Sequence, residues 1–101
     1  MDIINKWLKA TEKREPFTPR PYLECKDGFS VSIQVGRGMY SDPRSEGAEI
    51  YSEVELGFPS GPVPDYVLEY AQNPNTPEET VYSYVPVGVV EKLILLHGGP
   101  K

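Results

Sequence analysis

The chain has 101 residues, of which 39% are hydrophobic and 25% are charged. This length is that of one small domain, and the composition supports one modest core. The longest apolar run, Leu93 to Leu96, is far shorter than the roughly 20 residues that cross a bilayer. We therefore expect a single domain over residues 1–101 with no membrane-spanning segment.

Cysteine usage and the first residues indicate a compartment. Cys25 is the single cysteine, so no internal disulfide can form. Residues 1–7 lack the basic and apolar regions of a secretory signal. Both features predict a reducing, cytoplasmic location.

The net charge of −5 is distributed unevenly along the chain. Residues 41–79 carry nine acidic side chains and one basic side chain, Arg44, so this segment has a charge of −8. Such a segment repels the phosphate backbone of DNA or RNA, and direct nucleic-acid binding is disfavoured. It suits a basic partner surface, although an acidic face kept for solubility would have the same composition.

The first predicted element is a helix over residues 3–14, capped by Asp2, with one apolar stripe at helical spacing. Prolines at 16, 19 and 21 end it and favour an extended connector. Two strands follow, over residues 22–26 and 29–35, joined by a tight Asp27-Gly28 turn. In the second strand, apolar side chains alternate with Ser30, Ser32 and Gln34, which predicts one core face and one polar face.

After a polar loop over residues 36–47, long enough to carry function, a third strand is predicted over residues 50–56. A short helix over 62–71 with Ser60 as an upstream cap, a fourth strand over 80–85 and a buried last helix opened by Pro86 complete the chain. Gly98 is expected to end that helix. The order α-β-β-β-α-β-α predicts an α+β fold, with a mostly antiparallel four-stranded sheet packed by the first and last helices.

Residues that commonly carry catalysis are sparse. One Cys and one His cannot build a zinc site, and the acidic residues do not show the spacing of a cation site. Cys25 and His97 are available as a nucleophile and base, but the dipole at the end of the last helix explains His97 without catalysis. The glycine clusters match neither common phosphate-binding motif. We expect a non-enzyme without metal or cofactor.

The polar face of the predicted sheet is the first candidate binding site. Strict alternation places on it six side chains that suit an interface: Gln34, Tyr51, Glu53, Glu55, Tyr82 and Tyr84. Tyrosine gives a large contact area with a hydrogen-bonding tip at little entropic cost. The alternative is that the helix over 62–71 covers this face and its tyrosines form a second core.

A second candidate site lies in loops. Arg20, Arg37 and Arg44 could bind the phosphate of a nucleotide signal, and Tyr40 could stack on its base. Pairing of exposed strand edges would in addition allow a homodimer.

Several segments together carry a family resemblance: residues 18–21 (TPRP), 25–34 (CKDGFSVSIQ), 82–87 (YSYVPV) and 97–99 (HGG). With them the chain resembles a family of small uncharacterised proteins encoded by phages and prophages of Gram-positive bacteria. The family assigns no activity to named residues. The resemblance implies an accessory protein in the cytoplasm of a bacterial host, where it binds and inhibits a host protein such as a nucleic-acid-handling defence nuclease.

Overall fold

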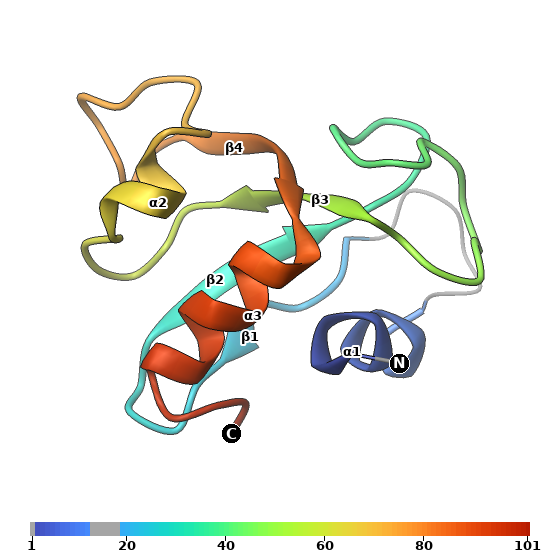
Figure 1. The fold of residues 1–101 in the computed structure, drawn as a ribbon, viewed down its shortest axis with the longest axis horizontal. Coiled ribbons are helices and arrows are strands. Elements are labelled where there is room, and N and C mark those ends of the chain that lie inside the picture. The colour runs from blue at the N-terminus through green and yellow to red at the C-terminus, as the bar shows by residue number, and fades with distance from the viewer. Residues whose placement is uncertain (1, 13–18) are drawn as a thin grey trace.

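The computed structural model describes residues 2–12 and 19–101, which form three helices and a four-stranded sheet (Figure 1). The elements are α1 (Ile3–Ala10), β1 (Leu23–Glu24), β2 (Ser30–Gln34), β3 (Glu53–Gly57), α2 (Asp65–Leu68), β4 (Val81–Pro86) and α3 (Val87–Leu96). Their order and the antiparallel sheet confirm the predicted α+β fold. The predicted Asp2 cap is also confirmed, since Asp2 Oδ1 accepts the Asn5 N–H at 2.8 Å.

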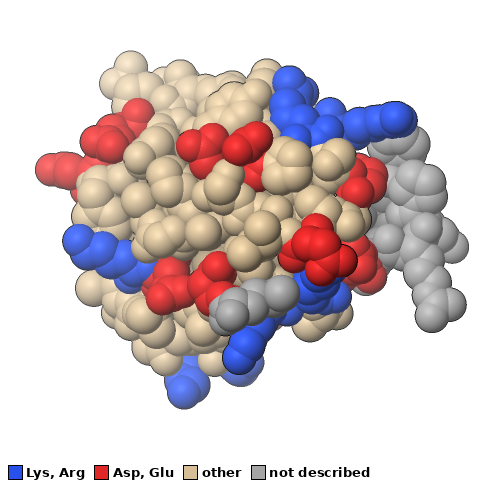
Figure 2. All heavy atoms as spheres, turned by 45° about the vertical axis from the view of Figure 1, so that its right-hand side comes forward, with Lys and Arg blue, Asp and Glu red and all other residues tan. Residues whose placement is uncertain are grey.

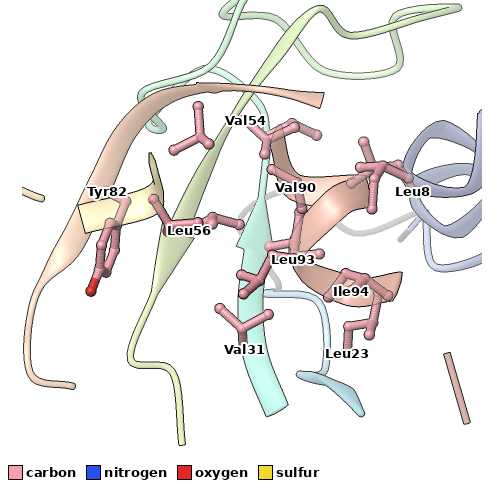
Figure 3. Packing of buried hydrophobic residues seen from close by; sticks show 14 of the residues in the cluster. Leu8, Leu23, Val31, Val54, Leu56, Tyr82, Val90, Leu93 and Ile94 are labelled. Carbon is pink, nitrogen blue, oxygen red and sulfur yellow. The ribbon is translucent and has the colours of Figure 1, made fainter. Parts of the chain in front are cut away.

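The core lies between one face of the sheet and the helices α1 and α3 (Figure 3). The sheet and the two helices contribute side chains that are at most 2% exposed, among them Leu8, Val31, Val54, Leu56, Val90, Leu93 and Ile94. Burying one such side chain contributes roughly 1.5–3 kcal/mol, so α3, with three of them, is the main apolar cover of the sheet. The prediction of a buried last helix holds for this inner side only, because Leu95 and Leu96 are exposed.

Two glycines end α3 as expected for a C-terminal glycine motif. The Gly98 N–H bonds the Leu95 carbonyl at 3.1 Å, and the Gly99 N–H bonds the Ile94 carbonyl at 3.0 Å. This pair of bonds is the Schellman arrangement, which requires a left-handed residue after the helix. Gly98 supplies it with a φ of +91°.

Short backbone segments cover both outer edges of the sheet. A bridge between Cys25 and Pro100 places the C-terminal residues along β1, and a bridge between Ala71 and Tyr82 places the end of the α2 segment along β4. Backbone hydrogen bonds of 2.8–3.1 Å accompany both bridges. Edge-to-edge pairing of two copies would have to break these bonds first.

Two of the predicted helices are shorter in the structure. α1 ends at Ala10, and residues 13–18, where the prediction of a longer helix and of the connector falls, lie outside the described residues. The helix predicted over 62–71 is reduced to the four residues of α2, which packs against α3 and β4. Its N-cap is Pro64, so the predicted Ser60 cap is wrong. Ser60 Oγ instead accepts the Ser30 N–H at 2.9 Å.

Candidate functional site

A bulge in β4 decides which tyrosines of the sheet reach solvent. Val54 pairs with Val85 and Leu56 pairs with Tyr82, so three steps along β4 oppose two steps along β3. The extra residue reverses the alternation, and Tyr84 takes a left-handed φ of +52°. The expectation that Tyr82 lies on the polar face is therefore wrong: it is 0% exposed, whereas Tyr84 is 38% exposed.

Tyr51 is buried as well, contrary to the prediction. β3 begins only at Glu53, so residue 51 precedes the strand and does not follow its alternation. The Asn5 side chain in α1 bonds both the N–H and the carbonyl of Tyr51, at 2.8 and 3.0 Å. The Tyr51 hydroxyl donates to the Ser45 carbonyl at 2.6 Å. Tyr51 thus ties the loop after β2 to α1, and Ile50, predicted in the core, is exposed instead.

Gln34 lies on the polar face but is covered by neighbouring chain. It is 8% exposed, because its side-chain amide forms two hydrogen bonds of 3.1 Å with the backbone of Arg20. Both ends of the amide are therefore satisfied within the protein, and Gln34 is not available to a ligand.

The loop after β2 brings Tyr40 against Tyr84. The Tyr84 N–H donates to the Tyr40 carbonyl at 3.0 Å, and the two ring centroids are 5.8 Å apart with the planes at 52°. The Tyr40 N–H in turn donates to Oε1 of Glu55 at 3.1 Å. Glu53 and Glu55 share one face of β3, since Val54 between them is buried. We call these four residues, Tyr40, Glu53, Glu55 and Tyr84, the Tyr40–Tyr84 face.

Tyr70 lies close to this face. Desolvation by its surroundings, then the carboxylates of Glu69 and Glu53, holds the pKa of the Tyr70 phenol above its ordinary value. Helical spacing within the short helix predicted over residues 62–71 would place Tyr70 on its apolar side, so its proximity to Glu53 was missed. Only the early end of α2 brings residue 70 to the edge of β4, where its carbonyl accepts the Ser83 N–H.

The second predicted site does not assemble as one group. Arg44 stands over the Tyr40 ring, with Cζ 5.5 Å from the centroid. Arg20 is used by α1, because its guanidinium donates to the Leu8 carbonyl and to Thr11 Oγ1. Arg37 is exposed, and its backbone N–H bonds Glu46. The structure therefore joins Tyr40 and Arg44 to the Tyr40–Tyr84 face and leaves Arg20 and Arg37 apart.

Charge on the surface is divided into small groups. Figure 2 shows Asp and Glu side chains in several separate clusters on one side of the molecule, with uncharged surface between them. The acidic side chains on this side of the molecule therefore do not form one continuous patch. Local combinations of aromatic and acidic groups, rather than one acidic patch, distinguish the regions of the surface.

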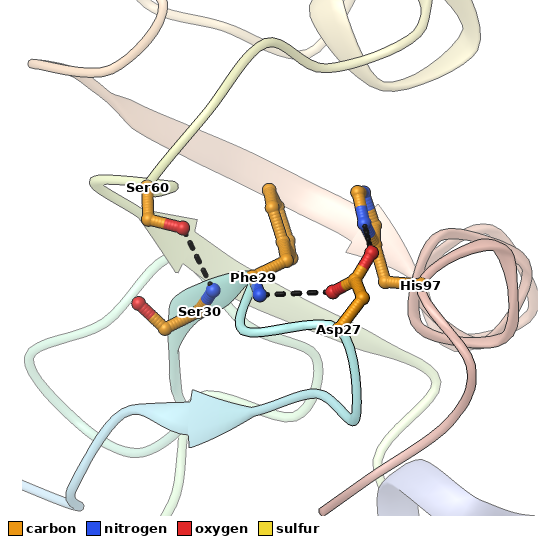
Figure 4. Close-up of polar contacts among 5 residues, drawn as sticks. All are labelled: Asp27, Phe29, Ser30, Ser60 and His97. Atoms are coloured by element: carbon orange, nitrogen blue, oxygen red, sulfur yellow. Dashed lines mark hydrogen bonds and ion pairs between the residues drawn. The ribbon is translucent and has the colours of Figure 1, made fainter.

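A second polar cluster joins the β1–β2 turn to the end of α3 (Figure 4). Asp27 Oδ2 lies 2.7 Å from His97 Nδ1, and Oδ1 accepts the Phe29 N–H at 2.9 Å. These two contacts, the N–H of Phe29 first, hold the pKa of Asp27 below its ordinary 3.8. The rings of Phe29 and His97 are stacked with centroids 3.9 Å apart.

The cluster links the β1–β2 turn to the end of α3 through side-chain contacts. In Figure 4 the Phe29 ring stands between Ser60 and His97, and Ser60 Oγ is directed at the backbone of Ser30. Cys25 is fully buried, and burial, with the charge of Asp27 second, raises the pKa of its thiol. A buried thiol with a raised pKa is inert as a nucleophile.

Comparison of the chain with protein-family models, with curated proteins and with solved structures finds no match. The resemblance to phage-encoded proteins stays a prediction.

A shallow pocket between α1 and the segment before β3 has room for roughly one water molecule, which is too little for a nucleotide. No three His, Cys, Asp or Glu side chains of residues 2–12 and 19–101 are grouped so as to hold a metal ion. None of the helices described is long and apolar enough to cross a membrane.

Proposed function

We propose that the protein is a non-catalytic binding protein that docks a basic protein surface on the Tyr40–Tyr84 face. The observation that carries this proposal is Tyr84, a bulky side chain that is exposed and held in the left-handed region. Such a conformation costs on the order of 1–3 kcal/mol and is concentrated at functional sites. Phe58 has a similar φ and exposure, and Tyr84 differs from it by its contact with Tyr40, whose N–H bonds the Glu55 carboxylate.

The chemistry of the face suits a cationic partner. Two tyrosine rings, each more than a third exposed, offer contact area that loses little conformational entropy on binding. Glu53 and Glu55 are half-buried beside them, so their charges are screened by salt less than those of fully exposed groups. Charge complementarity of this kind speeds association and selects partners.

The resemblance to phage accessory proteins supports a host protein as the partner. A nuclease that holds nucleic acid in a basic groove presents the required charge. On this proposal the protein inhibits by occupying the groove, and no reaction of its own is involved.

Capture from a bacterial lysate tests the proposal. The tagged protein is compared with Glu53→Lys/Glu55→Lys and with the control Glu78→Lys/Glu79→Lys, which makes the same charge change in the exposed turn before β4. We expect the first variant to lose the captured protein and the control to keep it. Equal capture by both variants would remove the Tyr40–Tyr84 face from the account.

A further inference from the structure

We infer that the Tyr40–Tyr84 face recognises an arginine side chain of the partner, and that Arg44 occupies this position in the free protein as an internal competitor. The inference rests on the proposed function, since it names the group that the basic partner presents. Three observations support it. Arg44 stands over the Tyr40 ring, and Oε2 of Glu55 takes no hydrogen bond from the described residues. The backbone on either side of Arg44 is held by hydrogen bonds.

The guanidinium of Arg44 stands over the Tyr40 ring on which a ligand guanidinium would stack, and it forms no ion pair with Glu55. Its Cζ is 5.5 Å from the Tyr40 centroid, within the range of a cation–π contact. It makes no ion pair or hydrogen bond with the side chains of residues 2–12 and 19–101. A single exposed cation–π contact contributes only about 0.5–1 kcal/mol, so an external group can displace Arg44.

Glu55 offers an acceptor beside the backbone of Tyr40. Its Oε1 accepts the Tyr40 N–H, while Oε2 takes no hydrogen bond from the described residues. No buried side-chain oxygen or nitrogen of these residues lacks a partner, so Oε2 is in contact with solvent. A planar guanidinium can stack on a ring and donate to a carboxylate at once, whereas an ammonium is a compact point charge. The face therefore suits arginine better than lysine.

The backbone around Arg44 is held independently of its side chain. Ser41 Oγ donates to the Pro43 carbonyl at 3.0 Å, and the buried Tyr51 hydroxyl donates to the Ser45 carbonyl at 2.6 Å. The residues before and after Arg44 are thus both tied to the fold. The side chain of Arg44 can leave the Tyr40 ring, or be removed by substitution, while the loop keeps its course.

Nuclear magnetic resonance titration tests the inference on the labelled full chain. The probe is a short blocked peptide that alternates glycine with arginine, compared with peptides that carry lysine or citrulline instead. We expect the arginine peptide to shift the Tyr40, Glu55 and Tyr84 amide resonances at the lowest concentration. Arg44→Ala should bind it about two- to fivefold more tightly, the factor that a contact of about 0.5–1 kcal/mol corresponds to.

Matched variants separate competition from net charge. Arg37→Ala makes the same charge change in the same loop, where the side chain is exposed, and we expect a smaller gain from it than from Arg44→Ala. Glu55→Gln keeps an acceptor for the Tyr40 N–H but removes the charge, so the arginine peptide should bind more weakly. Glu79→Gln, which lies outside the face, should bind like the wild type.

The outcomes distinguish this inference from the proposed function. If Arg44→Ala gains no more than Arg37→Ala, or if the lysine peptide binds as tightly as the arginine peptide, the inference is wrong and a basic partner remains supported. If neither basic peptide shifts the resonances of the face, the inference and the proposed function are both contradicted.

Discussion

At Tyr84, the aromatic side chain that we expect to favour binding is disfavoured by the backbone conformation. Its φ of +52° disfavours a bulky side chain, while asparagine tolerates this region. We expect Tyr84→Asn to leave the free energy of unfolding unchanged, or to raise it by about 1 kcal/mol, and to abolish capture of the partner. Thermal denaturation and the lysate capture measure the two effects.

Phe58 provides the matched control for Tyr84. It has a φ of +51° and is 46% exposed, but it follows β3 outside the Tyr40–Tyr84 face. Phe58→Asn should relieve the same backbone strain and leave capture intact. A Tyr84→Asn protein that unfolds well below the wild type would contradict the account, because Tyr84 would then be a structural residue.

The contact between Asp27 and His97 should make the stability of the fold depend on pH. The pKa of Asp27 is lower in the folded chain than its ordinary 3.8, so its charged form stabilises the fold above pH 3.8 and this contribution is lost as the pH falls through the folded value. Asp27→Asn keeps an acceptor for the Phe29 N–H and removes the charge. We expect it to lower the melting temperature at neutral pH and to converge with the wild type below pH 3.8.

Melting curves recorded across this pH range check the expectation. Glu79→Gln is the control, since it removes a carboxylate from an exposed turn and should melt like the wild type throughout. A difference between Asp27→Asn and the wild type that grows toward acid pH would refute the assigned role of Asp27.

At the scale of single elements, alternation predicted the faces of β2 correctly and, in β4, the exposure of Tyr84 but not the burial of Tyr82. In β2 and its flanks, Phe29, Val31, Ile33 and Val35 are all buried, because the strand is regular there. Residues 81–85 alternate equally well in the sequence, yet the bulge turns Tyr82 inward. Nothing in the local pattern marks the bulge, since Tyr and Val both fit a core position and the pairing with β3 decides between them.

Replacing glycine by alanine should have opposite effects on stability at the two ends of α3. Gly98 has a φ of +91°, and an added Cβ would lie 3.3 Å from the Lys26 Cβ. Gly98→Ala should therefore destabilise the protein by about 1–2 kcal/mol. Gly88 lies inside α3 and faces open space, so Gly88→Ala should stabilise it by roughly 0.5–1 kcal/mol.

Urea denaturation of the two variants measures both changes on one scale. The expected signs are opposite although the substitution is the same. If Gly98→Ala were as stable as the wild type, the left-handed end of α3 would not be a requirement of the fold.

At the scale of the whole molecule, element order was predictable and the candidate site was predictable only in part. Strand alternation predicted that Glu53, Glu55 and Tyr84 lie on the polar face. The contacts of Glu55 and Tyr84 with Tyr40, and of Arg44 with the Tyr40 ring, depend on the course of the loop over residues 36–47. Long-range bonds such as that between Asn5 and Tyr51 position the end of that loop, and no local pattern encodes them.

The covered sheet edges bear on assembly. Because both β1 and β4 already bond neighbouring segments, we expect no edge-paired homodimer. Light scattering over a range of concentrations should give the mass of one chain. A mass of two chains would contradict this expectation and would indicate that a second copy displaces one of the segments that bond β1 or β4.

Carboxylate footprinting of the complex tests whether the captured partner docks on the Tyr40–Tyr84 face. A reagent that labels exposed carboxylates is applied to the free protein and to the complex, and the labelled positions are identified by mass spectrometry. The account predicts that labelling of Glu53 and Glu55 falls in the complex while labelling of Glu79 does not change. Equal labelling of Glu53 and Glu55 in both states would show that the partner docks elsewhere.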